Sequence, residues 1–389
     1  MTEETMPPVI PVIAESRELA LFLTTTREFL GREMAMSRVR DLHAADRPYE
    51  RQWWTQAAQL GWTSLLVPES LGGGSVSDSG VSDLAGVMAH VGRAVAPGPL
   101  IPVSVVAAAL SNASNAPSHQ HTVNGLLDGS CVAAWAVDEP GLPFGSAPAT
   151  TAIETARGYR IDGVKTQVEA GLLCDVLLVS VNLPEGQAQL LVPADAEGVT
   201  VTRTPSVDLV RDYATVRFDG VEVEPTSVVG RVPETPAARE RQARLAQVLQ
   251  CAETVGALDA MFDMTVAWAQ TRYSFGRPLS SYQALKHRFA DMKMQLESCR
   301  AAAAAACRAF AHDPDTAGLA VSAAKAYVGE YSIAIAQECV QLHGGIGVTW
   351  EHDLHVYLRR IEVNRALYGT TEEHQEKVYV LAKQGAVIR

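Results

Sequence analysis

The spacing of hydrophobic positions changes twice along the chain and divides it into three parts. From about residue 15, apolar side chains such as Leu19, Leu23 and Leu30 recur at helical intervals. A glycine-rich run at 72–75 interrupts this pattern and indicates a loop between helices. The first part therefore predicts an N-terminal helical domain over residues 1–128.

The middle of the chain has short runs in which apolar and polar positions alternate. A period of two indicates strands that bury one face, which is typical of an antiparallel sheet. Arg157 and Gly158 mark the turn of a hairpin. We therefore expect a middle antiparallel β domain over residues 129–232. Its predicted strands lie near residues 131–137, 153–160, 175–181, 189–192 and 215–223.

After Pro233 and Pro236 the helical period returns and continues towards the end of the chain. Thr370 and Glu373 have the spacing of a capping box that opens the last helix. This part predicts a C-terminal four-helix bundle over residues 233–389, so the chain as a whole predicts an α+β fold. The predicted helices lie near residues 237–271, 282–312, 316–342 and 372–384.

Composition limits the classes of function. The chain has 389 residues, of which 47% are hydrophobic, and this is enough for more than one core. Its net charge of -12 leads us to expect no nucleic-acid partner. Its 6 cysteines lack metal-ligand spacing, which predicts reduced thiols and no metal site. Glu3, Glu4 and Pro7 disfavour a signal peptide, and no run is apolar enough to span a membrane, so we expect a cytoplasmic protein without a membrane partner.

Two segments carry candidate binding chemistry. In the first, Arg272 and Gln283 lie on either side of a Phe-Gly-Arg-Pro turn and are suited to grip a pyrophosphate. In the second, which begins at Gln341, the Gly344-Gly345 step lets backbone amides approach an anion closely. A simple helix stop would also explain the Gly and Pro of the first segment. The order and spacing of the two segments favour the binding interpretation.

Together, these segments resemble the flavin-binding elements in the C-terminal domain of acyl-CoA dehydrogenases. The likeness covers most of the chain, because a helical domain, a β domain and a helical bundle follow one another in that family. It implies an acyl-CoA substrate, FAD as cofactor, and a site built across a subunit interface. The residues that match family contacts to the adenosine diphosphate part of a neighbouring subunit's FAD are Arg272, Phe275, Gln283, Gln341, Gly344 and Gly345.

The catalytic base of the family is missing from both of its usual positions. The reaction needs a carboxylate that removes an α-proton while hydride leaves to the flavin. Most members have this Glu directly before a Gly-Thr pair near the C-terminus, where this chain has Tyr368. A second group has it early in the first long C-terminal helix, where this chain has Ala246.

Glu253 is the candidate substitute, because it is the only charged residue between positions 245 and 258. Small or uncharged helical neighbours, including Ala246 and Ala257, would leave room for a ligand beside it. The alternative is a buried structural Glu that a partner from another helix or subunit satisfies. We favour this structural role over the catalytic one.

The middle domain also departs from the family pattern. A family stretch of Glu-Pro-Gly-x-Gly-Ser-Asp survives only as Glu139-Pro140-Gly141. In a second stretch, Gln167 replaces an aromatic residue that packs on the flavin ring, and Glu169 adds a negative charge. A divergent loop that still binds FAD remains the alternative.

The residues that would contact the FAD of a neighbouring subunit match the family pattern. The residues that would hold a FAD and the base within this chain's own site depart from it. This asymmetry predicts one subunit of a heterotetrameric acyl-CoA dehydrogenase, resembling those of actinobacterial steroid catabolism. A second acyl-CoA dehydrogenase-like subunit would supply the base, the acyl group would be bulky or polycyclic, and electron-transfer flavoprotein would be the acceptor. The alternatives are a self-sufficient homo-oligomer that uses Glu253 and a flavin-free scaffold with the same fold.

Overall fold

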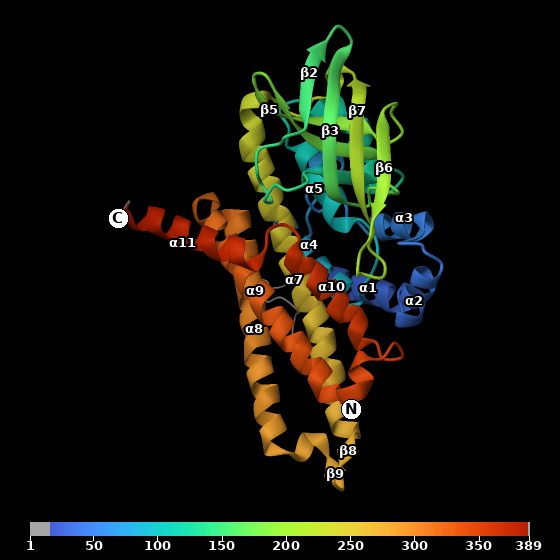
Figure 1. Cartoon of the computed structure of the whole chain (residues 1–389), viewed down its shortest axis with the longest axis vertical. Coiled ribbons are helices and arrows are strands. Elements are labelled where there is room, and N and C mark those ends of the chain that lie inside the picture. The colour runs from blue at the N-terminus through green and yellow to red at the C-terminus, as the bar shows by residue number, and fades with distance from the viewer. Residues whose placement is uncertain (1–15, 388–389) are drawn as a thin grey trace.

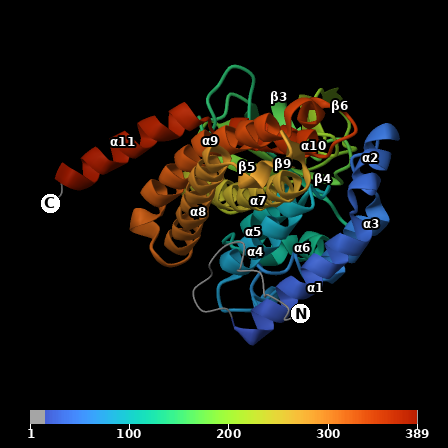
Figure 2. The same ribbon diagram turned by 90° about the horizontal axis from the view of Figure 1, so that it is seen from below.

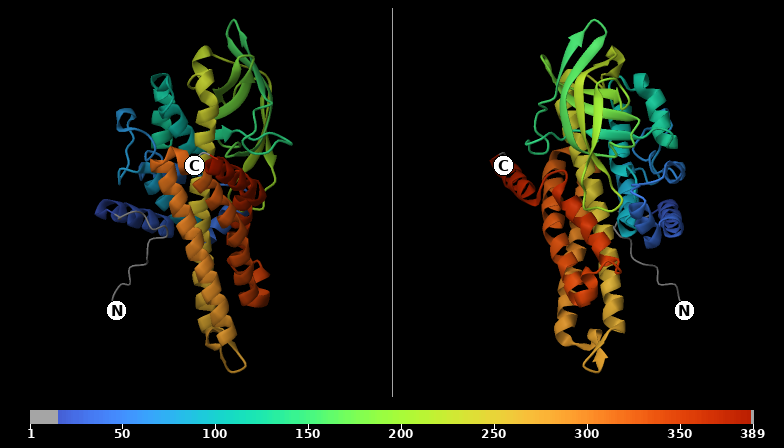
Figure 3. Two further views of the ribbon diagram at one scale, coloured as in Figure 1. Left: turned by 90° about the vertical axis from the view of Figure 1, so that its left-hand side faces the viewer. Right: turned by 45° about the vertical axis from the view of Figure 1, so that its right-hand side comes forward.

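The computed structural model describes residues 16–387, so the pattern at Glu3, Glu4 and Pro7 lies outside the described residues. The molecule is elongated, with a β domain at one end and a helical bundle at the other (Figure 1). The N-terminal helices lie against the side of this arrangement, and the long helix α7 (Thr235–Thr271) runs from the β domain to the far end of the bundle (Figure 3).

The N-terminal part is helical, as the apolar periodicity predicts, and its described residues, 16–128, form six α-helices. The first is capped by Ser16, whose side-chain oxygen accepts a hydrogen bond from the Leu19 N–H at 3.1 Å. The core between these helices and the bundle is continuous, since α4 and α5 bury most of their residues. The helices are α1 (Arg17–Glu33), α2 (Met36–Ala44), α3 (Arg51–Gln59), α4 (Gly80–Arg93), α5 (Leu100–Ser111) and α6 (Gln120–Asp128).

The β domain is a mixed sheet, and here the expectation of an antiparallel sheet is only partly right. The strands are β1 (Ala133–Ala136), β2 (Thr151–Thr155), β3 (Gly158–Glu169), β4 (Val176–Leu183), β5 (Gly186–Pro193), β6 (Val199–Thr204) and β7 (Tyr213–Val223). The spatial order is β1-β4-β2-β3-β7-β6, with β5 on β4. The predicted hairpin is present, because Thr155 pairs with Gly158. However, β1 runs parallel to β4, and β2 meets β4 in parallel too. Alternation along a sequence reports which face is buried, not the direction of the neighbouring strand.

The C-terminal part contains the four predicted helices and a fifth that the apolar pattern missed. The helices are α7, α8 (Gln283–His312), α9 (Pro314–His343), α10 (Leu354–Ala366) and α11 (Thr371–Val387). The unpredicted helix is α10, in which Arg359, Arg360 and Glu362 interrupt the apolar period although Arg360 is fully buried. The bundle consists of α7 to α10, and α11 packs on α9 and projects outward (Figure 2).

The capping box at the start of α11 is confirmed. The Thr370 N–H donates to Glu373 Oε2 at 2.8 Å, and the Glu373 N–H donates to Thr370 Oγ1 at 3.3 Å. None of the 6 cysteines forms a disulfide, and four of them are buried. No helix among the described residues is long and apolar enough to cross a membrane. The domain boundaries at 128 and 232 stay predictions.

Candidate functional site

Glu253 lies on α7, is fully buried and is surrounded by partners. Its Oε1 accepts hydrogen bonds from Arg211 Nη2 at 2.6 Å and from Arg360 Nη1 at 2.8 Å. Its Oε2 accepts one from Asn364 Nδ2 at 3.0 Å. The expectation of room for a ligand is therefore wrong, because these side chains occupy the space beside the carboxylate. The geometry favours the structural role, and catalysis by Glu253 stays a prediction.

The backbone around Glu253 is also tightly packed. At the crossing of α4 and α7, a Cβ added to Gly92 would lie 1.9 Å from the Glu253 carbonyl oxygen. One turn further along α7, a Cβ added to Gly256 would lie 1.9 Å from the Ala89 carbonyl oxygen. Only glycine at both positions allows the two helices to approach this closely. The backbone of α4 therefore lies directly against the backbone of α7 at Glu253.

The partners of Glu253 belong to a larger buried network that sequence reasoning missed. Arg360 pairs with Asp208, and its Nη1 also donates to the Ala96 carbonyl at 3.2 Å. Burial opposes ionisation of Asp208, but Arg360, Arg211 and the Val210 N–H together hold the pKa of that carboxyl below its usual value. Arg211 Nε lies 3.4 Å from Glu169 Oε1. The network thus joins the β6–β7 connection, β3, α7 and α10.

Tyr368, which the family resemblance places at the usual position of the base, is part of an aromatic cluster. Its ring centroid lies 5.9 Å from that of Trp135 and 5.7 Å from that of Phe144. Its hydroxyl donates to Glu169 Oε2 at 3.4 Å. Burial holds the pKa of Tyr368 far above its usual value, so the phenol stays neutral and is no proton acceptor at this position.

Two of the residues that match the family's flavin bed, Glu139 and Glu169, are buried and contact other residues of the chain. Glu139 connects its loop to β3 and to the residue before β2. Its Oε1 accepts hydrogen bonds from Lys165 Nζ at 2.6 Å and from the Thr150 N–H at 2.8 Å. Gln167 is exposed at an irregular point of β3 and has a φ of 53°. Glu169 is buried, and burial raises its pKa to about 7. The packed and partly charged surroundings of Glu169 do not fit a flavin ring.

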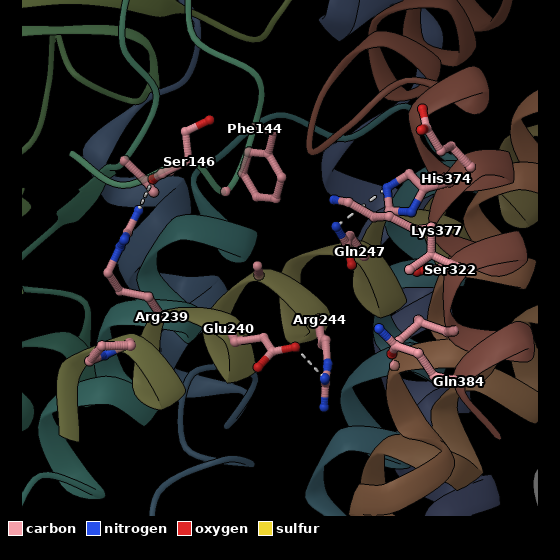
Figure 4. Close-up of a pocket in the computed structure, with 18 of the residues that line it drawn as sticks. Phe144, Ser146, Arg239, Glu240, Arg244, Gln247, Ser322, His374, Lys377 and Gln384 are labelled. Carbon is pink, nitrogen blue, oxygen red and sulfur yellow. Dashed lines mark hydrogen bonds and ion pairs between the residues drawn. The ribbon is translucent and has the colours of Figure 1, made fainter. Parts of the chain in front are cut away.

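A cavity of about 660 Å³ lies between the loop at Phe144, α7, α9 and α11 (Figure 4). Gln247 and His374 line this cavity and also contact Tyr368. The Gln247 Nε2 donates to the Tyr368 carbonyl at 2.9 Å, and the His374 Nε2 donates to the same carbonyl at 3.0 Å. Burial lowers the pKa of His374 to about 4, so it is neutral at physiological pH. The lining contains both cations and carboxylates, and Arg244 is already paired with Glu240. Glu169, Glu253 and Tyr368 are not part of it.

The two binding segments lie together at the opposite end of the bundle. Arg272 directly follows α7, Gln283 begins α8, and Gly344 directly follows α9. The small hairpin of β8 (Tyr273–Ser274) and β9 (Arg277–Pro278) connects α7 to α8 at this end (Figure 1). All of the predicted contact residues are exposed, namely Arg272, Phe275, Gln283, Gln341, Gly344 and Gly345.

This end of the bundle fits a phosphate-bearing ligand. A Cβ added to Gly344 or Gly345 would meet nothing within 4 Å, so the backbone there is open to close approach. The start of α8 offers unsatisfied N–H groups, and Arg272 offers a planar cation. We refer to Arg272, Gln283, Gln341, Gly344 and Gly345 as the exposed half-site. Their contact with FAD stays a prediction.

Comparisons with known proteins agree with this architecture. Residues 16–130 match the N-terminal domain of acyl-CoA dehydrogenases, and residues 239–379 match the C-terminal domain. The acyl-CoA dehydrogenase IpdE2 of Mycobacterium tuberculosis is 29% identical over 357 residues, which cover 92% of this chain and 94% of the relative. The Tcur3481-Tcur3483 steroid acyl-CoA dehydrogenase has a TM-score of 0.85 at 27% identity and covers 95% of this chain and 99% of its own. The ChsE4-ChsE5 complex from Mycobacterium tuberculosis has a TM-score of 0.83 at 25% identity, and the match covers 94% of this chain and 97% of the chain in that complex. The chain therefore belongs to the acyl-CoA dehydrogenase family.

Proposed function

We propose that this chain is one subunit of a heteromeric, FAD-dependent acyl-CoA dehydrogenase that introduces an α,β double bond into an acyl-CoA thioester. It supplies the exposed half-site to a FAD that a second, different subunit holds. The second subunit supplies the catalytic base. Electron-transfer flavoprotein is the expected acceptor of the electrons.

The contrast between the two ends of the bundle carries this proposal. The exposed half-site offers a cation, open glycines and a helix start to a ligand. At the other end, Tyr368 and Glu169 contact each other where a flavin ring and a base would be required. A self-sufficient enzyme would need both ends, whereas a flavin-free scaffold would need neither.

In this proposal, the residues of the chain bind and orient a cofactor. Bound FAD supplies the hydride acceptor of the reaction. Arg272 holds the pyrophosphate through a charge-assisted contact, and Gly344 and Gly345 present backbone amides to it. Gln283 and Gln341 add neutral hydrogen bonds that fix its orientation. Proton abstraction belongs to the partner, because Tyr368 is neutral and Glu253 is paired with Arg211 and Arg360.

The relatives support a partner of different sequence and a bulky substrate. The ChsE4-ChsE5 relative is a complex of two proteins with different names, ChsE4 and ChsE5. The Tcur3481-Tcur3483 relative is a steroid acyl-CoA dehydrogenase. By this likeness, the acyl group of the substrate is steroid-derived or similarly polycyclic.

The test is the flavin content of the purified chain, alone and co-expressed with the product of a neighbouring acyl-CoA dehydrogenase-like gene. We expect little flavin absorbance from the chain alone and about one FAD per pair of different subunits in the complex. One tightly bound FAD per protomer of the chain alone would contradict the proposal and favour the homo-oligomer that uses Glu253. A flavin-free complex would favour the scaffold.

A further inference from the structure

We propose that Trp268 and His343 position Arg272 for the pyrophosphate, and that their stacked rings set the spacing between Arg272 and the Gly344-Gly345 amides. The inference rests on the proposed function. Neither aromatic residue is part of the exposed half-site, and both lie behind it.

The rings form a column beneath Arg272. The Arg272 guanidinium carbon lies 5.8 Å from the centroid of the Trp268 ring. The Trp268 and His343 rings stack with centroids 5.3 Å apart and planes 18° apart. His352 packs against His343 edge-on at 4.7 Å. Three aromatic rings, from the end of α7, the end of α9 and the turn before α10, thus lie next to a single exposed cation.

Within this column, the position of the His343 ring is fixed by burial and by a hydrogen bond to the backbone. Its side chain is buried, and its Nδ1 donates to the Cys339 carbonyl one turn earlier at 2.8 Å. It directly precedes Gly344, whose φ of 66° turns the chain out of α9. The ring that supports Trp268 is therefore attached to the backbone that presents the glycine amides. The column links the two segments of the half-site, although they are far apart in sequence.

Arg272 needs such support because little else holds it. Within residues 16–387, no carboxylate pairs with its guanidinium, and the side chain is exposed. A long side chain without a fixed partner must lose its rotational freedom when it binds a phosphate. An aromatic face beneath the guanidinium restricts it before binding and leaves the N–H groups at the edge available. Trp268 therefore acts through Arg272 and is a positioning residue, not a catalytic one.

The experiment measures the apparent Kd for FAD of the heteromeric complex after flavin removal, by titration with FAD and detection of flavin fluorescence. The variants are Trp268→Leu, Trp268→Phe, His343→Asn and His343→Phe, with Arg272→Ala as the reference. The melting temperature and subunit composition of each apo complex are recorded alongside.

We expect Trp268→Leu to weaken FAD binding about 3-fold to 30-fold, the range of a cation–π contact. Trp268→Phe should restore most of the affinity because it keeps an aromatic face. His343→Phe keeps the stack and loses the Nδ1 donor, whereas His343→Asn keeps a donor and loses the stack. If stacking positions Arg272, only His343→Asn should weaken binding at an unchanged melting temperature.

A matched control lies where α2 meets the turn before α10. Arg40 lies 5.3 Å over the Trp350 ring, which stacks on His355 at 4.7 Å, but Arg40 is already paired with Asp353 at 2.9 Å. Trp350→Leu should leave the Kd for FAD unchanged. An equal loss in Trp350→Leu, or equal affinities of Trp268→Leu and the parent, would overturn the positioning role. If Arg272→Ala itself leaves the Kd unchanged, the proposed function fails instead.

Discussion

The hydroxyl of Tyr368 lies 3.4 Å from Oε2 of Glu169, and this contact joins the turn before α11 to the end of β3. The first residue stands at the usual position of the family's base, and the second stands in the stretch that usually lies against the flavin. Their side chains contact each other where the family's base and flavin ring would be required. The contact supports the proposal that a second subunit supplies the catalytic base.

Replacing Glu253 with Gln should reduce stability more than activity. The substitution removes a charge that faces both Arg211 and Arg360, and breaking a buried ion pair costs about 3 kcal/mol or more. Because Arg360 keeps Asp208, we expect the low end of that range. Urea unfolding of the chain measures the stability loss.

Turnover of the flavin-loaded complex separates the two roles of Glu253. A missing general base costs roughly 100-fold to 10,000-fold, so a rate within about tenfold of the parent would support the structural role. A collapse of turnover with FAD bound and the oligomer intact would make Glu253 the base. Asp263→Asn is a matched control, because it also removes an α7 carboxylate from an arginine, at an exposed site.

Replacing Glu169 with Gln should change the pH dependence of stability. Burial raises the pKa of Glu169 to about 7 in the folded chain, from 4.5 as its ordinary value. The folded state therefore binds this proton more tightly than the unfolded state. The resulting contribution to stability is complete below pH 4.5 and is lost as pH rises through 7.

Glu169→Gln removes this dependence, because Gln does not titrate. Relative to the parent, its free energy of unfolding should gain up to about 3 kcal/mol between pH 4.5 and pH 8, since each pKa unit is worth about 1.4 kcal/mol. Chemical unfolding at a series of pH values measures the difference. Stability curves that run parallel through this range would show that Glu169 is ionised in the folded state.

Replacing Arg272 should remove flavin from the complex without unfolding the chain. A charge-assisted phosphate contact contributes about 1.5 to 3 kcal/mol, so Arg272→Ala should weaken FAD binding by at least about tenfold. Arg272→Lys should restore it only in part, because Lys lacks the planar fork. Full flavin occupancy in Arg272→Ala would show that the segment has another role. Arg277→Ala is the control, since Arg277 stacks on Tyr282 instead, 3.9 Å from the centroid of its ring.

Gly345→Ala should impair FAD binding at no cost to the fold. A Cβ there meets nothing within 4 Å in this chain, and the position does not require a positive φ. The added methyl group would instead crowd a phosphate that approaches the amide. Gly344→Ala should lose flavin and also stability, because its φ of 66° disfavours a side chain. Thermal melting and flavin content distinguish the two variants. Equal melting temperatures for both would contradict the expected backbone strain.

The sequence alone determined those features that depend on neighbours along the chain. Helical and alternating periods predicted the α, β, α order, and side-chain spacing predicted the Thr370–Glu373 capping box. The turn at Arg157 and Gly158 predicted the β2–β3 hairpin. Local hydrogen bonds and side-chain periods decide these elements, so a short stretch of sequence contains the necessary information.

Only the tertiary structure decided which distant residues meet. Sequence reasoning identified Glu253 as an isolated charge on a helix, but its partners Arg211 and Arg360 lie 42 and 107 positions away. It missed α10 for the same reason, because the buried Arg360 resembles a surface residue until Asp208 and Glu253 are placed beside it. The parallel pairing of β1 with β4 and the stacking of Trp268 on His343 were equally hidden. A charged side chain is buried only where an oppositely charged group from another part of the fold pairs with it. The residues next to it in the sequence do not show whether such a partner exists.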